Sequence, residues 1–293
     1  IGDALLRRTN RKVAKRIKKY ITRLRGLYIK VGQFLGVMSN LFTQDFIEQL
    51  AQLQDRVPAM DYGIIKKRFI EEWGKIPEEV FFRFERNAIA SASLGQVHTA
   101  YLTDGTKLAV KVLYPGIEKL VESDLGAVRV ISKLTNFFFP YFDTSVIYEE
   151  FADMIRKEIN YEKEKENIIK FSENFAHETD FIFPEIVEEY SSKAILTTKY
   201  IEGIKINDVE GLKRAGLSPV KVSKNLIRSF CKMIFTDQFF HADPHPGNFF
   251  VLDGHKIAFV DFGAVEHISS RHKMIIRNLV RVIIRRDIPR ILE

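Results

Sequence analysis

Two short polar motifs in the C-terminal part of the chain constrain its fold and chemistry most. The first runs from His241 to Asn248, and the second is Asp261-Phe262-Gly263. They put an aspartate, an asparagine and a second aspartate at positions 243, 248 and 261, with strand-like residues between the motifs. Phosphoryl transfer needs such a set, because one carboxylate takes the proton of the acceptor hydroxyl while an amide and a carboxylate hold Mg²⁺. The competing interpretation is a turn rich in Asp, Pro and Gly, with Asn248 as a cap.

The spacing of these residues is that of protein kinases. The kinase pattern is H-R-D-x-x-x-x-N followed by D-F-G. Here Asp243 and Asn248 are five positions apart, the Asp-Phe-Gly sequence is complete, and Ala242 replaces the arginine. Order and spacing together favour a catalytic loop over a chance turn. We therefore predict that Asp243 is catalytic and that Asn248 and Asp261 hold the metal.

The two histidines of the first motif do not predict a transition-metal site. No third His, Cys or carboxylate is spaced to complete one with His241 and His245. We expect His241 to orient the catalytic loop and His245 to make a structural or local polar contact.

A predicted strand in the first half supplies a candidate phosphate ligand. Ala109-Val110-Lys111-Val112 follows a predicted hairpin turn, and in kinases a strand lysine contacts the α- and β-phosphates. The upstream segment that should cover the nucleotide as G-x-G-x-x-G reads Ala90-Ser91-Ala92-Ser93-Leu94-Gly95. Alanine restricts positive φ, so this loop should be stiffer and should approach phosphates differently from the loop of an ordinary protein kinase.

The composition is that of a globular protein with enough apolar material for a core. The 293 residues are 46% hydrophobic and 28% charged, which allows one large domain or two small ones. The single cysteine, Cys231, excludes an intramolecular disulfide and a multi-cysteine metal site, and its apolar neighbours predict a buried thiol. No run of about 18 uncharged apolar residues is present, so we expect no membrane span. The first residue, Ile1, and the helical pattern at Glu293 indicate a piece of a longer protein.

Positive charge is concentrated at the N-terminal end. Residues 1–30 carry eleven basic side chains and one acidic side chain, whereas the net charge of the whole chain is +7. Apolar residues recur there at steps of three and four, which predicts an amphipathic helix with a basic opposite face. These residues are Val13, Ile17, Ile21, Leu24, Tyr28, Val31 and Leu35. Three interpretations stay open for the basic face: solvated surface, contact with anionic lipid headgroups, and nucleic acid. No interleaved aromatic motif supports nucleic acid, so we expect no such partner.

The rest of the pattern predicts helices, then strands, then helices. The predicted helices are residues 44–54, 62–73, 117–137, 145–175 and 226–240. The predicted strands are residues 81–87, 95–101, 107–113, 181–183, 193–200, 249–252 and 256–260. The aromatic cluster at 137–142 should be exposed. Strands before helices, with the metal motifs in the second half, predict a two-lobed α+β fold.

Further motifs make the chain resemble the atypical kinase family called ABC1, ADCK, UbiB or AarF-type, over nearly its whole length from Arg23 onwards. These motifs are Lys30-Val31-Gly32-Gln33 (K-x-G-Q), Leu53 to Pro58, the alanine-rich loop with Gly95 to His98, Val110 to Ile117, and His241 to Asn248. The resemblance implies a protein-kinase-like two-lobed fold with an N-terminal helical extension and a helical insert in the small lobe. Its implied parts are the extension with K-x-G-Q (1–80), the N lobe with the insert (81–200) and a truncated C lobe (201–293).

The resemblance also implies roles for charged residues. It makes Lys111 the nucleotide-binding strand lysine and Glu164 its helix partner. It makes Lys30 a catalytic residue that enters the active site from the added helix and meets Glu158. The family motif E-x-D reads Glu158-Ile159-Asn160 here, so a neutral amide replaces one carboxylate of this group.

The implied hinge between lobes is Thr198 to Ile201, which places Tyr200 beside the nucleotide. Lys199 stands where an acidic residue is usual. The implied cofactors are ATP or ADP with Mg²⁺.

The function implied by the resemblance is an atypical kinase or ATPase that supports ubiquinone or other prenyl-lipid metabolism at a membrane. The acceptor would be water or a small or lipid-like molecule, because the Lys30 helix would occupy the space of a protein substrate. The implied partners are the nucleotide, an anionic membrane surface or prenyl lipid, and lipid-biosynthesis enzymes. The bacterial cytoplasmic membrane, the mitochondrial inner membrane and the plastid all fit. Two other functions stay open: a nucleotide-gated scaffold that binds lipid or a partner enzyme with little turnover, and a Ser/Thr protein kinase.

Overall fold

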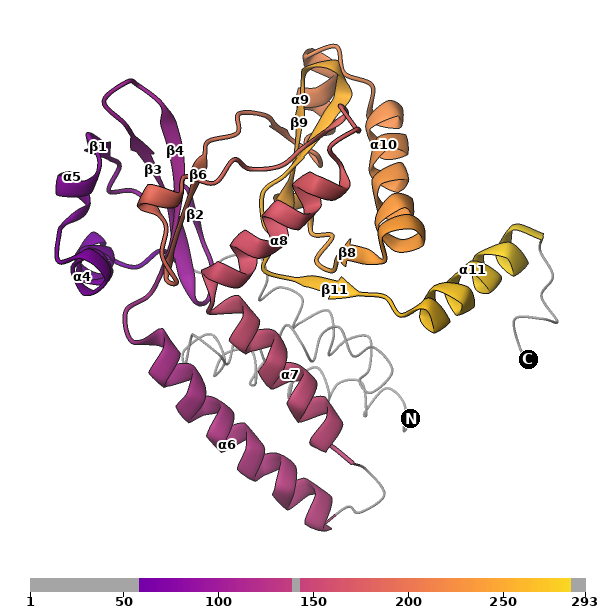
Figure 1. The fold of residues 1–293 in the computed structure, drawn as a ribbon, viewed down its shortest axis with the longest axis horizontal. Coiled ribbons are helices and arrows are strands. Elements are labelled where there is room, and N and C mark those ends of the chain that lie inside the picture. The colour runs from indigo at the N-terminus through magenta and orange to yellow at the C-terminus, as the bar shows by residue number, and fades with distance from the viewer. Residues whose placement is uncertain (1–57, 139–142, 286–293) are drawn as a thin grey trace, which may run out of the picture. The chain divides into compact units, whose positions relative to one another are not determined.

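The computed structural model describes residues 58–138 and 143–285, in which the chain forms two compact units (Figure 1). Of the described residues, the first unit contains 58–138, 143–162 and Ile186–Lys199, and the second contains Lys163–Glu185 and 200–285. The chain thus crosses between the units at 162–163, 185–186 and 199–200, and the last crossing lies inside the predicted hinge. The predicted helices at 13–35 and 44–54, with Lys30, lie outside the described residues, as do Phe139–Phe142. The three-part division at residues 80 and 200 stays a prediction.

An antiparallel sheet forms the centre of the first unit. Its order is β1-β3-β4-β6, with β2 also paired to β3. The strands are β1 (Arg83–Phe84), β2 (Ala90–Ser91), β3 (Gly95–Tyr101), β4 (Lys107–Leu113) and β6 (Ile195–Lys199). Alternate residues of β4, namely Leu108, Val110 and Val112, are fully buried, as the two-residue period of a strand requires. The predictions for β3 and β4 are confirmed to the residue.

The predicted strand at 81–87 is much shorter in the structure. Helix α5 (Pro77–Val80) has Phe81 as its C-cap, and the Phe81 N–H donates to the Pro77 carbonyl, so strand pairing is confined to β1. Helix α4 (Tyr62–Trp73) is confirmed as predicted. Its fully buried Phe69 ring meets Phe81 and Phe84 edge-on, at centroid distances of 6.1 and 5.5 Å.

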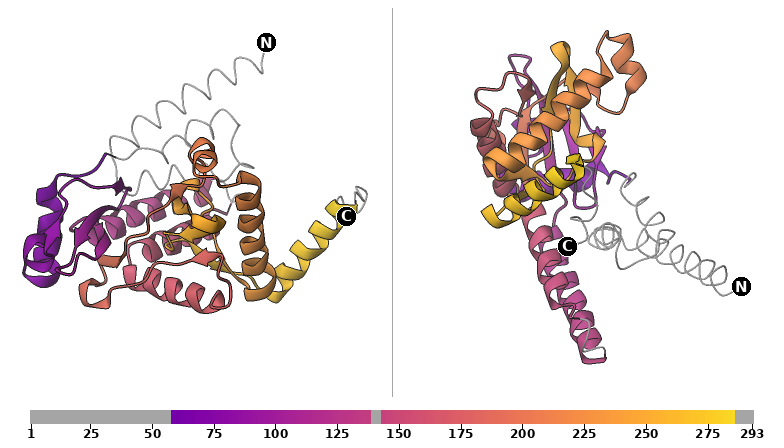
Figure 2. Two further views of the ribbon diagram at one scale, coloured as in Figure 1. Left: turned by 90° about the horizontal axis from the view of Figure 1, so that it is seen from above. Right: turned by 90° about the vertical axis from the view of Figure 1, so that its right-hand side faces the viewer.

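Two long helices, α6 (Ile117–Phe138) and α7 (Ser145–Glu158), run side by side as a hairpin within the first unit (Figure 2). Their buried seam contains Val121, Leu125, Phe151 and Ile155. At the tip, Asn136 Oδ1 accepts hydrogen bonds from the backbone N–H (2.9 Å) and hydroxyl (2.7 Å) of Thr144. Phe137 and Phe138 beside it are exposed, which confirms the prediction for the described part of the aromatic cluster.

The helix predicted from 145 to 175 is in fact two helices, α7 and α8 (Tyr161–Asn174). The Tyr161 N–H donates to the carbonyl of Lys193, in the segment before β6, at 3.0 Å. This tertiary hydrogen bond replaces the next intrahelical one. It leaves Glu158 at the end of α7 and Asn160 immediately before α8.

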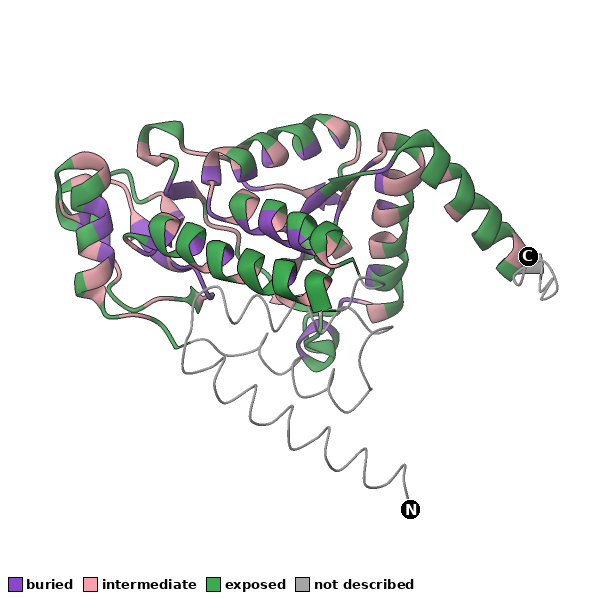
Figure 3. Ribbon diagram, turned by 90° about the horizontal axis from the view of Figure 1, so that it is seen from below, coloured by how far each residue is buried: buried purple, intermediate pink, exposed green. Residues whose placement is uncertain are grey.

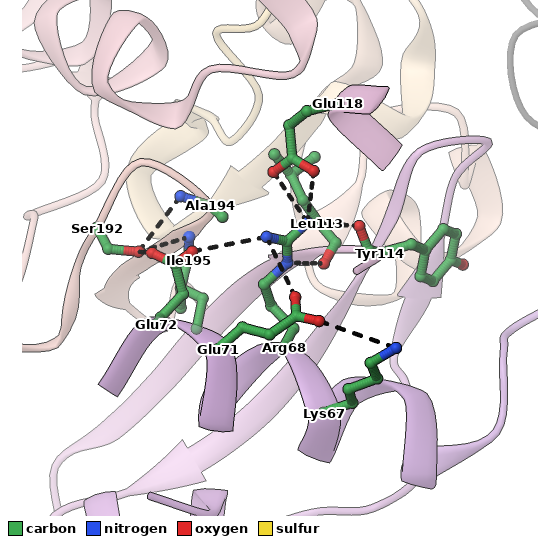
Figure 4. A network of polar contacts seen from close by, with 10 residues as sticks. All are labelled: Lys67, Arg68, Glu71, Glu72, Leu113, Tyr114, Glu118, Ser192, Ala194 and Ile195. Carbon is green, nitrogen blue, oxygen red and sulfur yellow. Dashed lines mark hydrogen bonds and ion pairs between the residues drawn. The ribbon is translucent and has the colours of Figure 1, made fainter. Parts of the chain in front are cut away.

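A buried arginine on α4 joins that helix to the sheet (Figure 4). Arg68 is 5% exposed. Its Nε donates to the carbonyl of Leu113 (3.1 Å), and its Nη2 donates to the carbonyl of Tyr114 (2.6 Å) and to the Glu118 carboxylate (3.0 Å). One guanidinium therefore binds the last residue of β4, the residue after it, and the first turn of α6.

The same network reaches the segment that precedes β6. Glu72, one turn after Arg68 on α4, lies 3.5 Å from its Nη1. The Ser192 hydroxyl donates to Glu72 at 2.6 Å (Figure 4). Glu72 thereby connects Arg68 to Ser192, which lies 120 positions after Glu72 in the sequence.

The second unit contains a four-stranded mixed sheet in the order β5-β10-β9-β7, in which only β5 and β10 are parallel. Its strands are β5 (Phe181–Ile182), β7 (Ile204–Lys205), β9 (Phe249–Leu252) and β10 (Lys256–Phe259). A separate antiparallel pair is formed by β8 (Phe239–His241) and β11 (Val265–His267). The helices besides α8 are α9 (Val209–Arg214), α10 (Pro219–Lys232) and α11 (Ser270–Arg285). Most of α11 is exposed (Figure 3).

Phenylalanine side chains pack against one another in the core of the second unit. The fully buried Phe262 ring lies 5.1 Å from that of Phe171 and 5.9 Å from that of Phe183. The ring of His241 is 5.7 Å from Phe262 and 5.6 Å from Phe249. The second polar motif is therefore embedded through its central residue in an aromatic cluster.

The helix predicted at 226–240 is wrong at both ends. Helix α10 begins at Pro219, after Ser218 as N-cap, and a π-helical turn, η2 (Met233–Asp237), leads into β8. Cys231 is exposed, which corrects the prediction of a buried thiol. The buried Ser229 faces inward, and Cys231, two residues on, lies about 200° around the helix from it.

In the described part of the chain, no helix is long and apolar enough to cross a membrane.

We predict that Arg68→Met destabilises the first unit by about 2–4 kcal/mol, because it leaves buried carbonyls and a carboxylate without their donor. Urea unfolding followed by circular dichroism would measure the change. Arg86→Met is the matched control, since the Arg86 side chain is 70% exposed and pairs with Glu78. Its loss should cost less than about 1 kcal/mol. Equal effects of the two substitutions would contradict the structural role of Arg68.

Candidate functional site

The first polar motif forms the loop between β8 and β9, and a buried histidine links it to the second motif. His241 is 1% exposed. Its Nε2 donates to the backbone carbonyl of Asp261 at 2.5 Å, and its Nδ1 accepts from the backbone N–H of Asp243 at 3.3 Å. These contacts define a neutral imidazole protonated at Nε2. They agree with the predicted orienting role of His241.

Asn248 is fixed by the aspartate of its own motif. It ends a 3₁₀ turn, η3 (Pro246–Asn248), and its Nδ2 donates to Asp243 Oδ2 (2.9 Å) and to the Asp243 carbonyl (3.2 Å). Among the described residues, Asn248 Oδ1 makes no hydrogen bond. His245 makes a local contact, as predicted, because its Nδ1 accepts from the Gly247 N–H at 3.1 Å.

The strand register brings the two candidate metal ligands to one end of a hairpin. Phe249 of β9 pairs with Phe259 of β10, and the Val260 N–H donates to the carbonyl of Asn248 at 3.1 Å. Asn248 and Asp261 therefore flank the same end of the β9–β10 pair. Asp261 Oδ1 accepts from the Gly263 N–H at 3.0 Å.

This donor set fits Mg²⁺. The ion prefers oxygen ligands, and an amide oxygen with a carboxylate supplies two, leaving phosphates and water to complete an octahedron. The described residues contain no group of three or more His, Cys, Asp and Glu side chains suited to a metal. A site for Mg²⁺ here would consist of Asn248 and Asp261 with the phosphate oxygens of a nucleotide.

Helix α8 holds the central residue of the second motif. Glu164 is 4% exposed, and its Oε1 accepts from the Phe262 N–H at 3.1 Å. Asn167 Nδ2 donates to the Phe262 carbonyl at 2.9 Å. Asn167 was not among the predicted site residues. Its spacing of three from Glu164, which puts both side chains on one helix face, was the available signal.

The alanine-rich loop lies in the first unit. β2 pairs with β3, and the Ala92 N–H donates to the Gly95 carbonyl at 2.8 Å to close a turn. Ala90 and Ala92 are exposed and Ser91 is half-buried. Ser93 is buried, and in the described residues its Oγ has no hydrogen-bond partner. A buried hydroxyl without a partner fits a loop whose ligand is a phosphate oxygen.

The glycine of this loop is required by packing. A Cβ on Gly95 would lie 2.5 Å from the carbonyl oxygen of Val112 and 3.1 Å from the Tyr161 hydroxyl. Gly95 therefore lets the β3 backbone approach β4 closely. This need exists whether or not Gly95 also contacts nucleotide.

The two polar residues that follow Gly95 on β3 anchor neighbouring segments. Gln96 Oε1 accepts from the Met60 N–H (2.8 Å), and its Nε2 donates to His98 Nε2 (2.8 Å). His98 Nδ1 donates to the Glu85 carbonyl at 2.8 Å. Burial lowers the pKa of His98, which keeps the ring neutral in this ladder.

The other predicted site residues fall in different elements. Lys111 is on β4, the strand between β3 and β6, and Glu158 is the last residue of α7. Tyr200 follows β6. Lys111 and Glu164 belong to different units, so their pairing stays a prediction. Lys30, and with it the contact to Glu158, lies outside the described residues.

Comparisons with known proteins identify the family and the fold. Residues 52–293 match the family model of the ABC1 atypical kinase-like domain, which confirms the predicted kinase-like α+β fold. The chain is 37% identical over 264 residues to the chloroplastic protein Activity of BC1 complex kinase 8 of Arabidopsis thaliana, covering 88% of the chain and 35% of that protein. An uncharacterized protein of Synechocystis sp. is 34% identical, over 94% of the chain and 50% of its own length.

A solved structure supports the same fold. The Rv3197–erythromycin complex from Mycobacterium tuberculosis is 26% identical with a TM-score of 0.59, over 91% of this chain and 68% of that one. The chain spans half or less of the length of the two relatives from Arabidopsis and Synechocystis.

We predict that Gly95→Ala lowers the stability of the nucleotide-free protein by about 1–3 kcal/mol, because the new methyl group overlaps backbone. Thermal unfolding would measure this. Gly126→Ala, in α6, is the control: apart from its own helix backbone, no described atom lies within 4 Å of its Cβ position, and alanine favours helix by up to about 1 kcal/mol. If Gly95→Ala weakened nucleotide binding with no loss of stability, the packing role would be wrong.

Proposed function

Because the chain belongs to the ABC1 atypical kinase-like family, we propose that it binds ATP or ADP with Mg²⁺ and transfers a phosphoryl group to water or to a small or lipid-like acceptor. The observation that carries this proposal is the linkage of Asp243, Asn248 and Asp261 through one buried imidazole and one side-chain hydrogen bond. The family alone supports kinase-like activity. The nature of the acceptor and the role of each residue are what we propose beyond that activity.

In this proposal Asp243 is the catalytic carboxylate. The side chain is exposed, as a group that receives a proton from an incoming hydroxyl must be. One of its oxygens already accepts from Asn248 Nδ2, which directs the amide Oδ1 away from Asp243 and makes it available for a cation. Asn248 and Asp261 then hold Mg²⁺, whose chemical contribution is to neutralise charge on the phosphates.

The phosphate end of the proposal uses Lys111 and the alanine-rich loop. Strand β4 is hydrogen-bonded to β3 and β6, which fixes the backbone position of Lys111. Its side chain therefore starts from a defined point when it contacts phosphate oxygens. The orphan hydroxyl of Ser93 supplies a donor in the covering loop. Lys30, with Glu158, is proposed to restrict a protein substrate, and Tyr200 to line the nucleotide site from the hinge.

The proposed setting is prenyl-lipid metabolism, with ubiquinone as the leading example, at a membrane surface. A basic N-terminal segment favours anionic lipid. Membrane-bound lipid-biosynthesis enzymes are the proposed partners. A plastid location is supported by the chloroplastic relative, and the bacterial and mitochondrial membranes remain alternatives.

A nucleotide-gated scaffold with little turnover is the second candidate, and the neutral Asn160 favours it because the group around Lys30 loses a negative charge. Release of phosphate from ATP by purified protein, with and without anionic liposomes, separates the two. Turnover that rises on liposomes supports the enzyme, whereas nucleotide binding without turnover supports the scaffold. Phosphorylation of a peptide array would instead support the Ser/Thr protein kinase.

We predict that Asp261→Asn removes most of the Mg²⁺-dependent stabilisation by ATP, because Asn248 alone supplies no charge to the ion. A thermal-shift titration with MgATP would measure it. Asp253→Asn is the matched control, since Asp253 is an exposed carboxylate in the 3₁₀ turn η4 (Asp253–His255) of the same unit. An unchanged MgATP response of the Asp261 variant would remove this residue from the site.

A further inference from the structure

Resting on the proposed function, we propose that Asn167 is a positioning residue for the metal ligand Asp261, acting through the peptide group between Phe262 and Gly263. Asn167 Nδ2 donates to the carbonyl of Phe262 at 2.9 Å. The N–H of Gly263 donates to Asp261 Oδ1 at 3.0 Å. Both contacts lie in the second unit.

The planarity of the peptide bond connects these two hydrogen bonds. The Phe262 carbonyl and the Gly263 N–H belong to one rigid plane and point in opposite directions. When Asn167 fixes the carbonyl, it also fixes the direction of the N–H. That N–H in turn holds one oxygen of Asp261, and so sets the rotation of the carboxylate that would bind the ion.

The preceding peptide group is held in the same manner. Its carbonyl, that of Asp261, accepts from His241 at 2.5 Å, and its N–H, that of Phe262, donates to the buried Glu164 at 3.1 Å. The Phe262 ring between the two planes is fully buried. Of the two peptide planes between Asp261 and Gly263, Asn167 therefore fixes the one that His241 and Glu164 do not hold.

The amide N–H₂ is the group that this role requires. Asn167→Asp keeps the size of the side chain but puts an oxygen, with its charge, against the Phe262 carbonyl. Asn167→Ala removes the donor without adding repulsion. A positioning role through donation thus predicts that the aspartate variant is worse than the alanine variant. A role in filling space predicts the reverse order, because alanine leaves the larger void.

The first measurement is the Mg²⁺ concentration that gives half of the thermal stabilisation by ATP, at fixed ATP, in the full chain. We expect it to rise roughly three- to tenfold in Asn167→Asp and less in Asn167→Ala, as for the loss of one hydrogen bond. Stabilisation by ATP in EDTA should not change in either variant. Ser172→Ala is the control on α8, because the Ser172 hydroxyl donates to the Ile168 carbonyl of its own helix at 2.9 Å.

The second measurement is hydrogen exchange of the Gly263 amide without nucleotide or metal. We expect it to be faster in Asn167→Asp than in wild type and in the Ser172 control. Unchanged exchange, or a larger Mg²⁺ effect in the alanine variant than in the aspartate variant, would overturn the proposal. A wild-type protein that shows no Mg²⁺-dependent response to ATP would instead overturn the proposed function, even if exchange followed Asn167.

Discussion

The hydrogen bonding of one backbone segment, residues 260–264, is the constraint on which the second unit depends. Six of its backbone polar groups are hydrogen-bonded, five of them to residues outside the segment. The partners are the Asn248 carbonyl for Val260 N–H, His241 for Asp261 C=O, Glu164 and Asn167 for Phe262, the Asp261 carboxylate for Gly263 N–H, and Ala242 N–H for Ala264 C=O. Buried backbone groups need such partners. Because an unpaired group would cost free energy, these hydrogen bonds hold α8 and both ends of the β8–β9 loop against the segment.

In the first unit, buried backbone groups are hydrogen-bonded by a charged side chain, that of Arg68. Arg68 satisfies the carbonyls of Leu113 and Tyr114 at the point where the sheet gives way to a helix. A buried guanidinium is tolerable only when its donors are filled, and carboxylates from two helices complete its set. In both units, then, a buried polar side chain binds backbone where the chain changes from one element to another. Apolar packing alone does not specify such a junction.

Local patterns in the sequence predicted the elements whose limits are set locally. Helix α4 and strands β3, β4 and β9 were predicted to the residue, because alternation or helical periodicity ends there at turn-forming residues. The break between α7 and α8 could not be predicted in this way, since Tyr161 bonds to a carbonyl of Lys193, a residue distant in sequence. The exposure of Cys231 was missed for a related reason. Apolar neighbours along the chain do not tell which face of a helix meets the core.

The candidate site likewise contains residues that the local sequence reveals and residues whose contacts depend on distant parts of the chain. Asp243, Asn248 and Asp261 are recognisable in the sequence because proton transfer and metal binding themselves require carboxylate and amide oxygens at a given spacing. Glu164 and Asn167 both bond to the backbone of Phe262, and no motif spacing in the sequence announces these two contacts. Glu164 was selected only through the family resemblance, which paired it with Lys111, and the hydrogen bond to Phe262 gives it a second, structural use. Gly95 must likewise be glycine for a steric reason, because a Cβ would overlap the Val112 carbonyl. The alanine-rich sequence around it does not reveal this reason. Residues that touch a ligand can thus be inferred from the ligand's chemistry, whereas residues that hold those residues in place are found only where the backbone contacts are known.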